Sequence, residues 1–332
     1  MSVALTDIFA AAQVLRGQAD ATPLIPSALA PRLGGALWLK LETCQPIGAF
    51  KLRGAMSALA TLPKTTPGVV CCSTGNHGRG VAYAAAARGL RAVICMSELV
   101  PQAKVDGIRA LGAEVRIAGR SQDAAQRAAQ ALAATEGLVE ISPFDDPQVI
   151  AGQGTIALEM LAARPALDTL LIPLSGGGLA AGMAVAARAI SPNIRLIGVS
   201  MDRGAAMQAS LQAGHPVEVT EVESLADSLG GGIGLQNRLS FPLCRDLLDA
   251  VVLVTEAEIY AAMQALYHED RLIAEGASVV GIAALMAGKV APSAQMGTVI
   301  TGRNMDMAQF TKVISGQDIA LGEITVKGQR YG

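Results

Sequence analysis

One lysine stands in surroundings that are unusual for a charged side chain. Lys51 lies in the stretch PIGAFKLRGA (46–55), between an apolar Gly-Ala-Phe run and an Arg-Gly pair, ahead of an Ala-rich helical pattern. An amine in an apolar, partly desolvated pocket has a lowered pKa and becomes a nucleophile that can form a Schiff base with a carbonyl compound. A solvated lysine at the start of a helix would be the favoured interpretation if Lys51 stood alone.

Three polar or glycine-rich stretches each follow an apolar run that is typical of a strand. In the first, STGNHGRG (73–80), the chain passes from such a run into an Ala-rich helical pattern. Open α/β sheets bind ligands where strands end, and backbone N–H groups at a helix start favour an anion such as a carboxylate. A plain strand–helix loop is the alternative, but the two small hydroxyl residues, the asparagine and the histidine favour a binding function.

The second stretch, PLSGGGLAAG, has three consecutive glycines, Gly176 to Gly178, between a strand pattern and a helix pattern. Such a loop lets amide groups close around a phosphate at the helix N-terminus. There is a rival interpretation. The loop together with Ala181 also satisfies the dinucleotide-binding GxGxxG/A spacing, and Asp202 follows the next strand, as in a nicotinamide-dependent oxidoreductase. That rival explains neither Lys51 nor the Asn-His loop.

In the third stretch, VITGRNMDM, Thr301 ends a late apolar run. Taken alone it is most simply a strand end, but its hydroxyl could donate to or accept from a ring nitrogen. An amine that reacts with a carbonyl, a phosphate cradle and a hydroxyl for a ring nitrogen together indicate one cofactor, pyridoxal 5'-phosphate.

Short β-prone apolar runs alternate with Ala-rich amphipathic segments from Val69 onward, which is typical of βα units around a mostly parallel sheet. The length of 332 residues favours two domains. The proline- and aspartate-rich segment 141–149 divides two groups of units, and periodicity does not settle which group the first 50 residues join. We expect strands at 69–73, 91–96, 113–119, 137–142, 169–175, 194–200, 250–255 and 297–301, and helices that include 121–137 and 256–270.

Charge and cysteine usage argue against several classes of function. The formal net charge is -2 and no Lys/Arg block is present, which argues against a nucleic-acid or anionic-membrane partner and favours a small-molecule substrate. The cysteines lack CxxC spacing and the histidines are far apart, so we expect neither a disulfide framework nor structural zinc. The N-terminus lacks a basic n-region, and Pro173 with the glycine triplet breaks the uncharged run 169–187. A cytoplasmic protein without a membrane partner is expected.

Together and in this order, the motifs resemble those of the tryptophan-synthase-β type of pyridoxal-phosphate enzyme, in the threonine dehydratase and serine racemase family. AFKLRGA resembles the family's S-F-K-x-R-G-A lysine motif, STGNHGRG its S-x-G-N-H loop, SGGGL its G-G-G-G-L phosphate loop and TGRN its S-G-x-N strand end. The resemblance spans nearly the whole chain. Within the family, LKLETCQPIGAFKLRGA, STGNHGRGVAYA and PFDDPQVIAGQGTIALEML are most similar to the hydroxyectoine utilization dehydratases, relatives of threonine dehydratase.

The resemblance implies a fold and an assembly. The fold class is α/β, two-lobed, with a three-layer αβα arrangement and mostly parallel sheets, known as pyridoxal-phosphate fold type II. Residues 1–52 and 149–332 would form the large cofactor-binding domain, and residues 53–148 a small mobile domain that closes over the substrate. The chain would form a homodimer.

The resemblance also implies a role for each motif residue. Lys51 would be the Schiff-base lysine and the base that removes the substrate Cα proton. The cofactor would be held by Phe50 beside the ring, Asn76 at the phenolic oxygen, Thr301 at the pyridine nitrogen, and Ser175, Gly176, Gly177, Gly178 and Leu179 around the phosphate. The amino-acid substrate would bind through its carboxylate to Ser73, Thr74, Gly75, Asn76 and His77.

The implied reaction is β-elimination, in which a β-hydroxy amino acid loses its Cα proton and its hydroxyl as water, and an enamine is released. A neutral hydroxyl at Thr301, unlike a carboxylate, does not force the pyridine nitrogen to stay protonated, which suits a dehydratase better than a transaminase. Thr74, the second candidate catalytic residue, stands where racemases of the family use a serine as base and many dehydratases have alanine. Racemisation is therefore an alternative, and a non-catalytic ligand-binding protein of the same fold is another.

Other departures from the family pattern bear on ligands. Arg79 replaces a residue that is usually uncharged, and either recognises an anionic or acylated part of the substrate or faces solvent. Ser200 stands where some members use an acidic residue to bind a divalent cation, so no metal is expected there. Ser175 and Thr301 replace the commoner glycine and serine.

Overall fold

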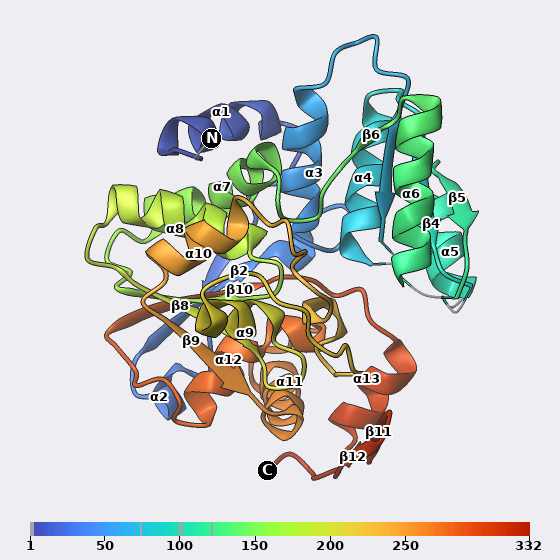
Figure 1. The fold of residues 1–332 in the computed structure, drawn as a ribbon. Coiled ribbons are helices and arrows are strands. Elements are labelled where there is room, and N and C mark those ends of the chain that lie inside the picture. The colour runs from blue at the N-terminus through green and yellow to red at the C-terminus, as the bar shows by residue number, and fades with distance from the viewer. Residues whose placement is uncertain (1–2, 74, 99, 101, 121) are drawn as a thin grey trace.

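The chain folds into two mostly parallel β-sheets, each with helices on both faces (Figure 1). The computed structural model describes residues 3–73, 75–98, 100, 102–120 and 122–332. Within these ranges, no helix is both long and apolar enough to cross a lipid bilayer. The predicted α/β fold class with mostly parallel sheets is confirmed.

The larger sheet has six strands in the order β1-β2-β10-β7-β8-β9. Every neighbouring pair is parallel except β1 with β2. The N-terminal segment thus joins this sheet, which periodicity left open, because β1 is short and Lys40 interrupts the apolar pattern of β2. The bounds are Leu24–Pro26 (β1), Ala36–Leu41 (β2), Thr169–Pro173 (β7), Arg195–Met201 (β8), Ala250–Val254 (β9) and Gln295–Ile300 (β10).

The smaller sheet has four parallel strands in the order β5-β4-β3-β6. Every strand expected from the sequence is present, with ends shifted by a few residues. The division into domains 1–52 with 149–332 and 53–148 stays a prediction. The bounds are Val69–Cys72 (β3), Ala92–Met96 (β4), Glu114–Ile117 (β5) and Val139–Glu140 (β6), and a separate hairpin pairs β11 (Ile319–Leu321) with β12 (Ile324–Val326).

Apolar side chains on both faces of each sheet hold the helices in place. In β3, Val69 and Cys71 pack in the cluster under α3, α4 and α5, whereas Val70 and Cys72 pack under α6. On the larger sheet, α1, α7, α8, α9 and α10 share one cluster, and α11 and α12 share the other. The helices are α1 (Leu5–Leu15), α2 (Ala30–Leu33), α3 (Lys51–Ala60), α4 (Asn76–Ala87), α5 (Gln102–Arg109), α6 (Gln122–Glu136), α7 (Pro147–Ala163), α8 (Gly178–Ile190), α9 (Ala206–Ala213), α10 (Ser240–Leu247), α11 (Glu256–Asp270), α12 (Val280–Met286) and α13 (Met307–Ile314).

The parallel strands β2, β10 and β7 are neighbours, so their carboxyl ends meet at one edge of the larger sheet. Thr301 follows β10, Ser175 lies just beyond β7, and Lys51 follows β2 after a short 3₁₀ turn and a loop. The Phe50 N–H donates to the Thr301 carbonyl at 2.9 Å, which joins two of these segments directly. The sheet topology therefore brings together residues that are far apart in the sequence.

Helix α3 starts at Lys51 and packs against both α4 and α7. Its approach to α7 is close enough to require glycine. A Cβ atom at Gly54 would lie 2.4 Å from the Gln153 side-chain nitrogen, and one at Gly152 would lie 2.6 Å from the Arg53 carbonyl oxygen. The two helices therefore meet backbone to backbone, which leaves α3 little freedom to shift.

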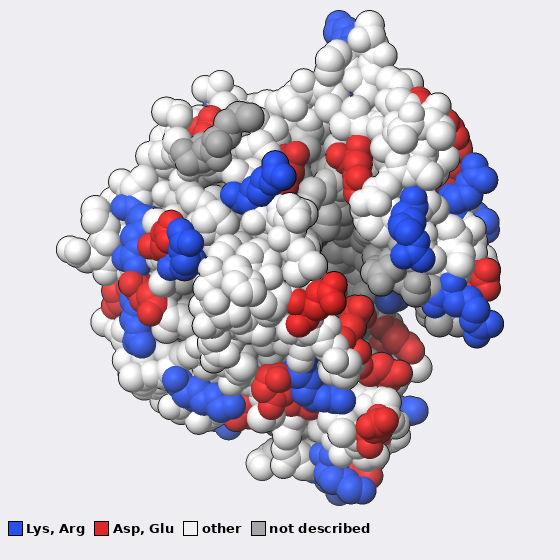
Figure 2. Space-filling view, in the orientation of Figure 1, with Lys and Arg blue, Asp and Glu red and all other residues white. Residues whose placement is uncertain are grey.

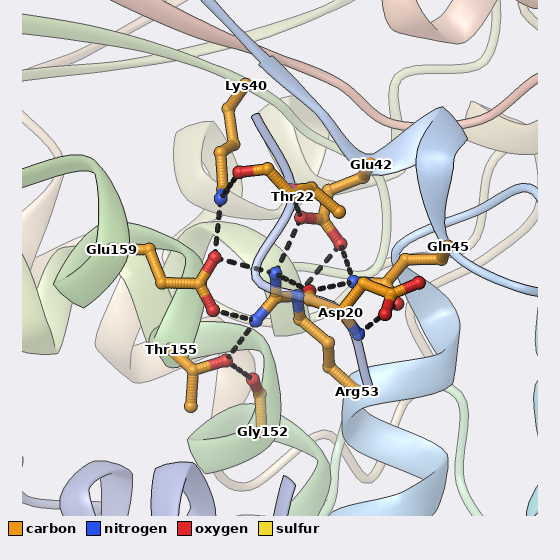
Figure 3. A network of polar contacts seen from close by, with 9 residues as sticks. All are labelled: Asp20, Thr22, Lys40, Glu42, Gln45, Arg53, Gly152, Thr155 and Glu159. Carbon is orange, nitrogen blue, oxygen red and sulfur yellow. Dashed lines mark hydrogen bonds and ion pairs between the residues drawn. The ribbon is translucent and has the colours of Figure 1, made fainter. Parts of the chain in front are cut away.

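The polar anchor of α3 is Arg53, whose guanidinium lies in a buried network of charges (Figure 3). Its Nε and Nη2 each donate to the Glu42 carboxylate at 2.8 Å, and its Nη1 donates to Glu159 at 2.5 Å. Lys40 completes the network through Glu159. Burial by itself raises the pKa of the Glu42 carboxyl, but the bonds and charge of Arg53 outweigh burial and hold this pKa below its usual value. Every polar side-chain atom of Arg53 and Glu42 therefore has a partner within the protein.

Replacing Glu42 by Gln tests how much this network anchors the fold. We expect the free energy of unfolding to fall by about 3–5 kcal/mol, because the buried guanidinium of Arg53 loses its bidentate partner. Glu114→Gln is the matched control, since it breaks a bidentate pair with Arg91 that is exposed and screened by solvent, so it should cost far less. Urea unfolding of both variants measures the difference, and equal losses would contradict an anchoring role for the buried network.

Candidate active site

Lys51 lies half-buried at the edge of the larger sheet. Its Nζ donates to the Pro143 carbonyl at 2.7 Å and lies 5.3 Å from the centroid of the Phe50 ring. Burial lowers the pKa of the Lys51 amine from 10.5 to about 8. The prediction that this lysine is a partly desolvated amine agrees with its surroundings.

The glycine loop between β7 and α8 presents backbone N–H groups that lack partners. In the described part of the chain, no acceptor bonds to the N–H groups of residues 176–179. The side chain of Phe144 lies against the loop, because a Cβ at Gly176 would be 2.1 Å from its ring and one at Gly178 would be 2.8 Å from its Cα. Gly177 has a φ of 90°, which favours glycine. Only glycines fit this loop, and its free amides form a cradle for an anion.

The segment Ser142–Asp146, which the sequence analysis treated only as a crossing between groups of units, is part of the site. Its Pro143 carbonyl contacts Lys51 and its Phe144 covers the glycine loop. Asp145 accepts bonds from the first backbone N–H groups of α10, and Asp146 caps the start of α7. The two adjacent aspartates ahead of Pro147 are a capping signal that would have located this segment as an ordered turn.

Helix α4 begins at Asn76, within the STGNHGRG motif. Asn76 is buried and its Nδ2 donates to the Glu275 carboxylate at 3.0 and 3.2 Å, while its Oδ1 accepts from Asn304 at 2.7 Å. Ser73 is half-buried and accepts from the Gly75 N–H at 3.3 Å. Thr74 lies outside the described residues. The partners of Asn76 thus come from segments that flank strand β10 of the larger sheet, which the sequence analysis did not predict.

His77 is buried, and its Nε2 lies 2.8 Å from the Ile141 carbonyl oxygen. Nε2 must carry the proton there, because a carbonyl only accepts. Burial first, and then the charge of Lys51, lowers the pKa of His77 to about 3, so the ring is neutral. Its Nδ1 is a buried acceptor that has no partner among the described residues. In this state only the backbone N–H of His77, and not its side chain, can donate to a carboxylate.

Thr301 is buried at the end of β10, and its hydroxyl lies 3.0 Å from the hydroxyl of Ser278. Ser278 ends the 3₁₀ turn Gly276–Ser278 (η3), which follows directly on Glu275. Neither Glu275 nor Ser278 was predicted as a site residue, because a short EGAS loop carries no periodic or motif signal. Burial and the charge of Asp227 raise the pKa of Glu275 to about 7.

Two predictions on ligands stay open. Arg79 is half-buried and its guanidinium packs on α5, where a Cβ at Gly107 would lie 2.8 Å from Nη1. Its Nε is buried and has no partner in the described ranges. Ser200 lies buried within β8, and the described residues contain no group of three or more histidine, cysteine or acidic side chains placed to hold a metal ion.

On the face shown in Figure 2, a hollow lies between the part of the chain built on the larger sheet and the part built on the smaller sheet. Acidic side chains lie along the lower rim of this hollow. An ion pair between Lys104 Nζ of α5 and Asp227 Oδ2, 3.7 Å apart, links the part of the chain built on the smaller sheet to the part built on the larger sheet.

The chemistry of the site fits pyridoxal phosphate. Free amides of the glycine loop suit its phosphate, the Lys51 amine suits its aldehyde, and the Thr301 hydroxyl suits its ring nitrogen.

Comparison with known proteins agrees with this chemistry. Residues 15–302 match the family model described as pyridoxal-phosphate dependent enzyme. The chain is 55% identical over 299 residues to a predicted threonine dehydratase of Sinorhizobium fredii, covering 89% of this chain and 90% of that protein. Maize serine racemase has a similar structure, with a TM-score of 0.89 and 30% identity, covering 94% of this chain and 97% of that chain. The structure of threonine deaminase isoform 2 of Solanum lycopersicum is also similar, with a TM-score of 0.86 and 37% identity, covering 93% of this chain and 91% of that chain.

The chain therefore belongs to the family of pyridoxal-phosphate-dependent enzymes. It has the type II fold and is a homologue of the threonine dehydratases and ammonia-lyases within that family. The predicted cofactor is confirmed, and the family favours the phosphate-cradle interpretation of the glycine loop over a nicotinamide site.

The lowered pKa of Lys51 can be tested on the apoprotein. We expect the rate at which an amine-acylating reagent modifies Lys51 to reach half its maximum near pH 8, because only the neutral amine reacts and burial favours that form. Peptide mass spectrometry would follow Lys51 and the exposed Lys64 in the same sample. A midpoint near 10.5 for Lys51 would show that its amine is fully hydrated.

Proposed function

We propose that the chain is a dehydratase that eliminates water from a β-hydroxy amino acid. The observation that carries this proposal is the half-buried amine of Lys51 at the same sheet edge as the free amides of Gly176–Leu179 and the hydroxyl of Thr301. The similarity to a predicted threonine dehydratase and to a threonine deaminase supports it.

Each predicted residue has a distinct task in this proposal. When bound, pyridoxal phosphate supplies an electron-withdrawing ring that makes the Cα proton of an attached amino acid acidic. The glycine-loop amides, with Ser175 and Leu179, would bind its phosphate, Phe50 would lie beside its ring, Asn76 would donate to its phenolic oxygen, and Thr301 would meet its ring nitrogen.

Lys51 anchors the cofactor and moves the proton. With a pKa of about 8, about a tenth of the Lys51 amine is neutral at pH 7, and this neutral form can accept the Cα proton. The Pro143 carbonyl accepts a bond from Nζ and limits its direction. The substrate carboxylate binds backbone N–H groups at the start of α4, next to Gly75, where the helix end favours an anion. The β-hydroxyl leaves as water, and the released enamine hydrolyses to a keto acid and ammonia.

The substrate is a β-hydroxy amino acid with a small side chain, such as threonine or serine, or an amino acid derived from hydroxyectoine. Three stretches that resemble the hydroxyectoine utilization dehydratases support the last choice. Arg79, a half-buried cation whose Nε has no partner in the described part of the chain, is the residue that would recognise an anionic or acylated substituent.

Amino-acid racemisation is the second candidate. The similarity to the structure of maize serine racemase favours it. A threonine hydroxyl at position 74 could return a proton to the opposite face of Cα, as the serine of the racemases does. Chiral analysis of residual substrate separates this outcome from elimination.

Purified protein should release keto acid from at least one of L-threonine, L-serine, hydroxyaspartate and hydroxyectoine-derived amino acids. We expect Lys51→Ala to lower kcat by about a thousandfold or more, because both the covalent anchor and the base are lost. Lys64→Ala, which removes an exposed lysine, should have no effect. Lys51→Ala with wild-type turnover, or keto acid from no β-hydroxy amino acid, would refute the dehydratase. Formation of D-serine without keto acid would establish the racemase instead.

We further propose that the chain acts as a homodimer in the cytoplasm, as the family resemblance implies. Sedimentation velocity of the cofactor-loaded protein should give a single species of about twice the monomer mass of 33.9 kDa. A monomer at micromolar concentration with full activity would contradict the dimer.

A further inference from the structure

We infer that the turn Glu275–Ser278 is a positioning element that orients both polar partners of the cofactor ring, Asn76 at one end and Thr301 at the other. This inference rests on the proposed function, in which those two side chains meet the phenolic oxygen and the ring nitrogen. Glu275 and Ser278 themselves need not touch the cofactor.

At the first end, Glu275 fixes which way the Asn76 amide points. Its carboxylate only accepts when ionised, and it receives the Asn76 Nδ2 at 3.0 and 3.2 Å. The opposite side of the amide is fixed as well, because Asn76 Oδ1 accepts from Asn304 Nδ2 at 2.7 Å. A flipped amide would place its oxygen against the carboxylate. Nδ2 thus keeps one N–H free to donate to a phenolic oxygen.

Glu275 is itself held on several sides. Ser228 donates to its carboxylate at 3.2 Å, and its backbone N–H donates to the Gly302 carbonyl at 3.0 Å. A Cβ at Gly302 would lie 2.6 Å from the carboxylate, so glycine is needed for this close approach. The side chain is 3% exposed. Burial and the charge of Asp227 raise its pKa to about 7, and the bonds from Asn76 and Ser228 oppose that rise.

At the second end, Ser278 restricts the hydroxyl of Thr301. The two oxygens are 3.0 Å apart, and both side chains are buried. Ser278 also accepts from the Gly302 N–H and donates to the Gly302 carbonyl, both at 2.9 Å. A hydroxyl has one hydrogen, so while Ser278 donates to that carbonyl, Thr301 donates to Ser278 and its Oγ1 can only accept from a ring N–H. If Ser278 donates to Thr301 instead, Thr301 keeps its own hydrogen for a ring nitrogen.

Glu275 and Ser278 hold fixed positions relative to each other because they belong to one closely packed turn. A Cβ at Gly276 would lie 2.3 Å from the Leu225 carbonyl oxygen, so the backbone of the turn packs directly on a neighbouring segment. The Ser278 N–H bonds back to the Glu275 carbonyl at 2.9 Å. A single packed turn therefore sets the direction of two side chains that come from different segments of the chain.

Cofactor affinity of the apoprotein tests the inference without relying on turnover. We expect Glu275→Leu to weaken pyridoxal phosphate binding by about tenfold or more, and Ser278→Ala by about threefold or more, in equilibrium dialysis. Glu275→Gln should change affinity by less than about threefold, because its amide oxygen still accepts from Asn76.

Two control variants remove comparable groups elsewhere. Asp168→Leu removes a carboxylate that accepts from Gln295 at the opposite edge of the same sheet, and Ser210→Ala removes a buried hydroxyl that accepts from Val217. Both should bind pyridoxal phosphate as the wild type does. Thermal unfolding of each apo variant shows whether it folds. If Glu275→Leu does not fold, the comparison of Ser278→Ala with Ser210→Ala decides.

A double-mutant cycle separates positioning from general stability. If Glu275 acts through Asn76, the pair Asn76→Ala with Glu275→Leu should bind pyridoxal phosphate as tightly as Asn76→Ala alone, whereas independent effects would multiply. Multiplied effects, or unchanged affinity in Ser278→Ala, would overturn the inference. These outcomes are distinct from failure of the proposed function, which is the absence of keto-acid release by the wild-type protein.

Discussion

The burial of one positive charge constrains the geometry of the site. Arg53 is almost completely buried, so its guanidinium must find its partners inside the protein. Glu42, in the 3₁₀ turn that follows β2, and Glu159 of α7 supply them. Because Arg53 lies two residues after Lys51, fixing it fixes the start of α3. The direction of the reactive amine thus depends on an ion network that takes no part in the chemistry.

Close backbone approach is the second recurring device. Gly54 and Gly152 let α3 and α7 meet, Gly176 and Gly178 let Phe144 cover the glycine loop, and Gly302 lets Glu275 reach its position. In each case a methyl group would collide with backbone atoms or with a buried or half-buried side chain. The glycines of this chain therefore serve tertiary packing as much as ligand binding, and the close packing keeps the polar groups of the site in fixed positions.

Much of the site was predictable because its signals are local. Gly176–Gly178 and Thr301 each follow an apolar run at a strand end, and Lys51 stands in an apolar stretch ahead of a helix, so short windows were enough to predict them as site residues. Glu275, Ser278 and Pro143 were missed, because each acquires its place through contacts with residues more than twenty positions away. The same reason explains why β1 and β2 were not foreseen, since short strands depend on the sheet that they join.

By itself, the sequence determined the parallel α/β architecture and the chemical groups of the site, because periodicity and strand-end motifs are written in neighbouring residues. Only the tertiary structure decided that the pKa of Lys51 falls to about 8, that His77 is neutral and bonded through Nε2, and that the Asn76 amide faces Glu275. Desolvation and hydrogen-bond direction depend on which distant segments surround a group, and no local pattern encodes those surroundings.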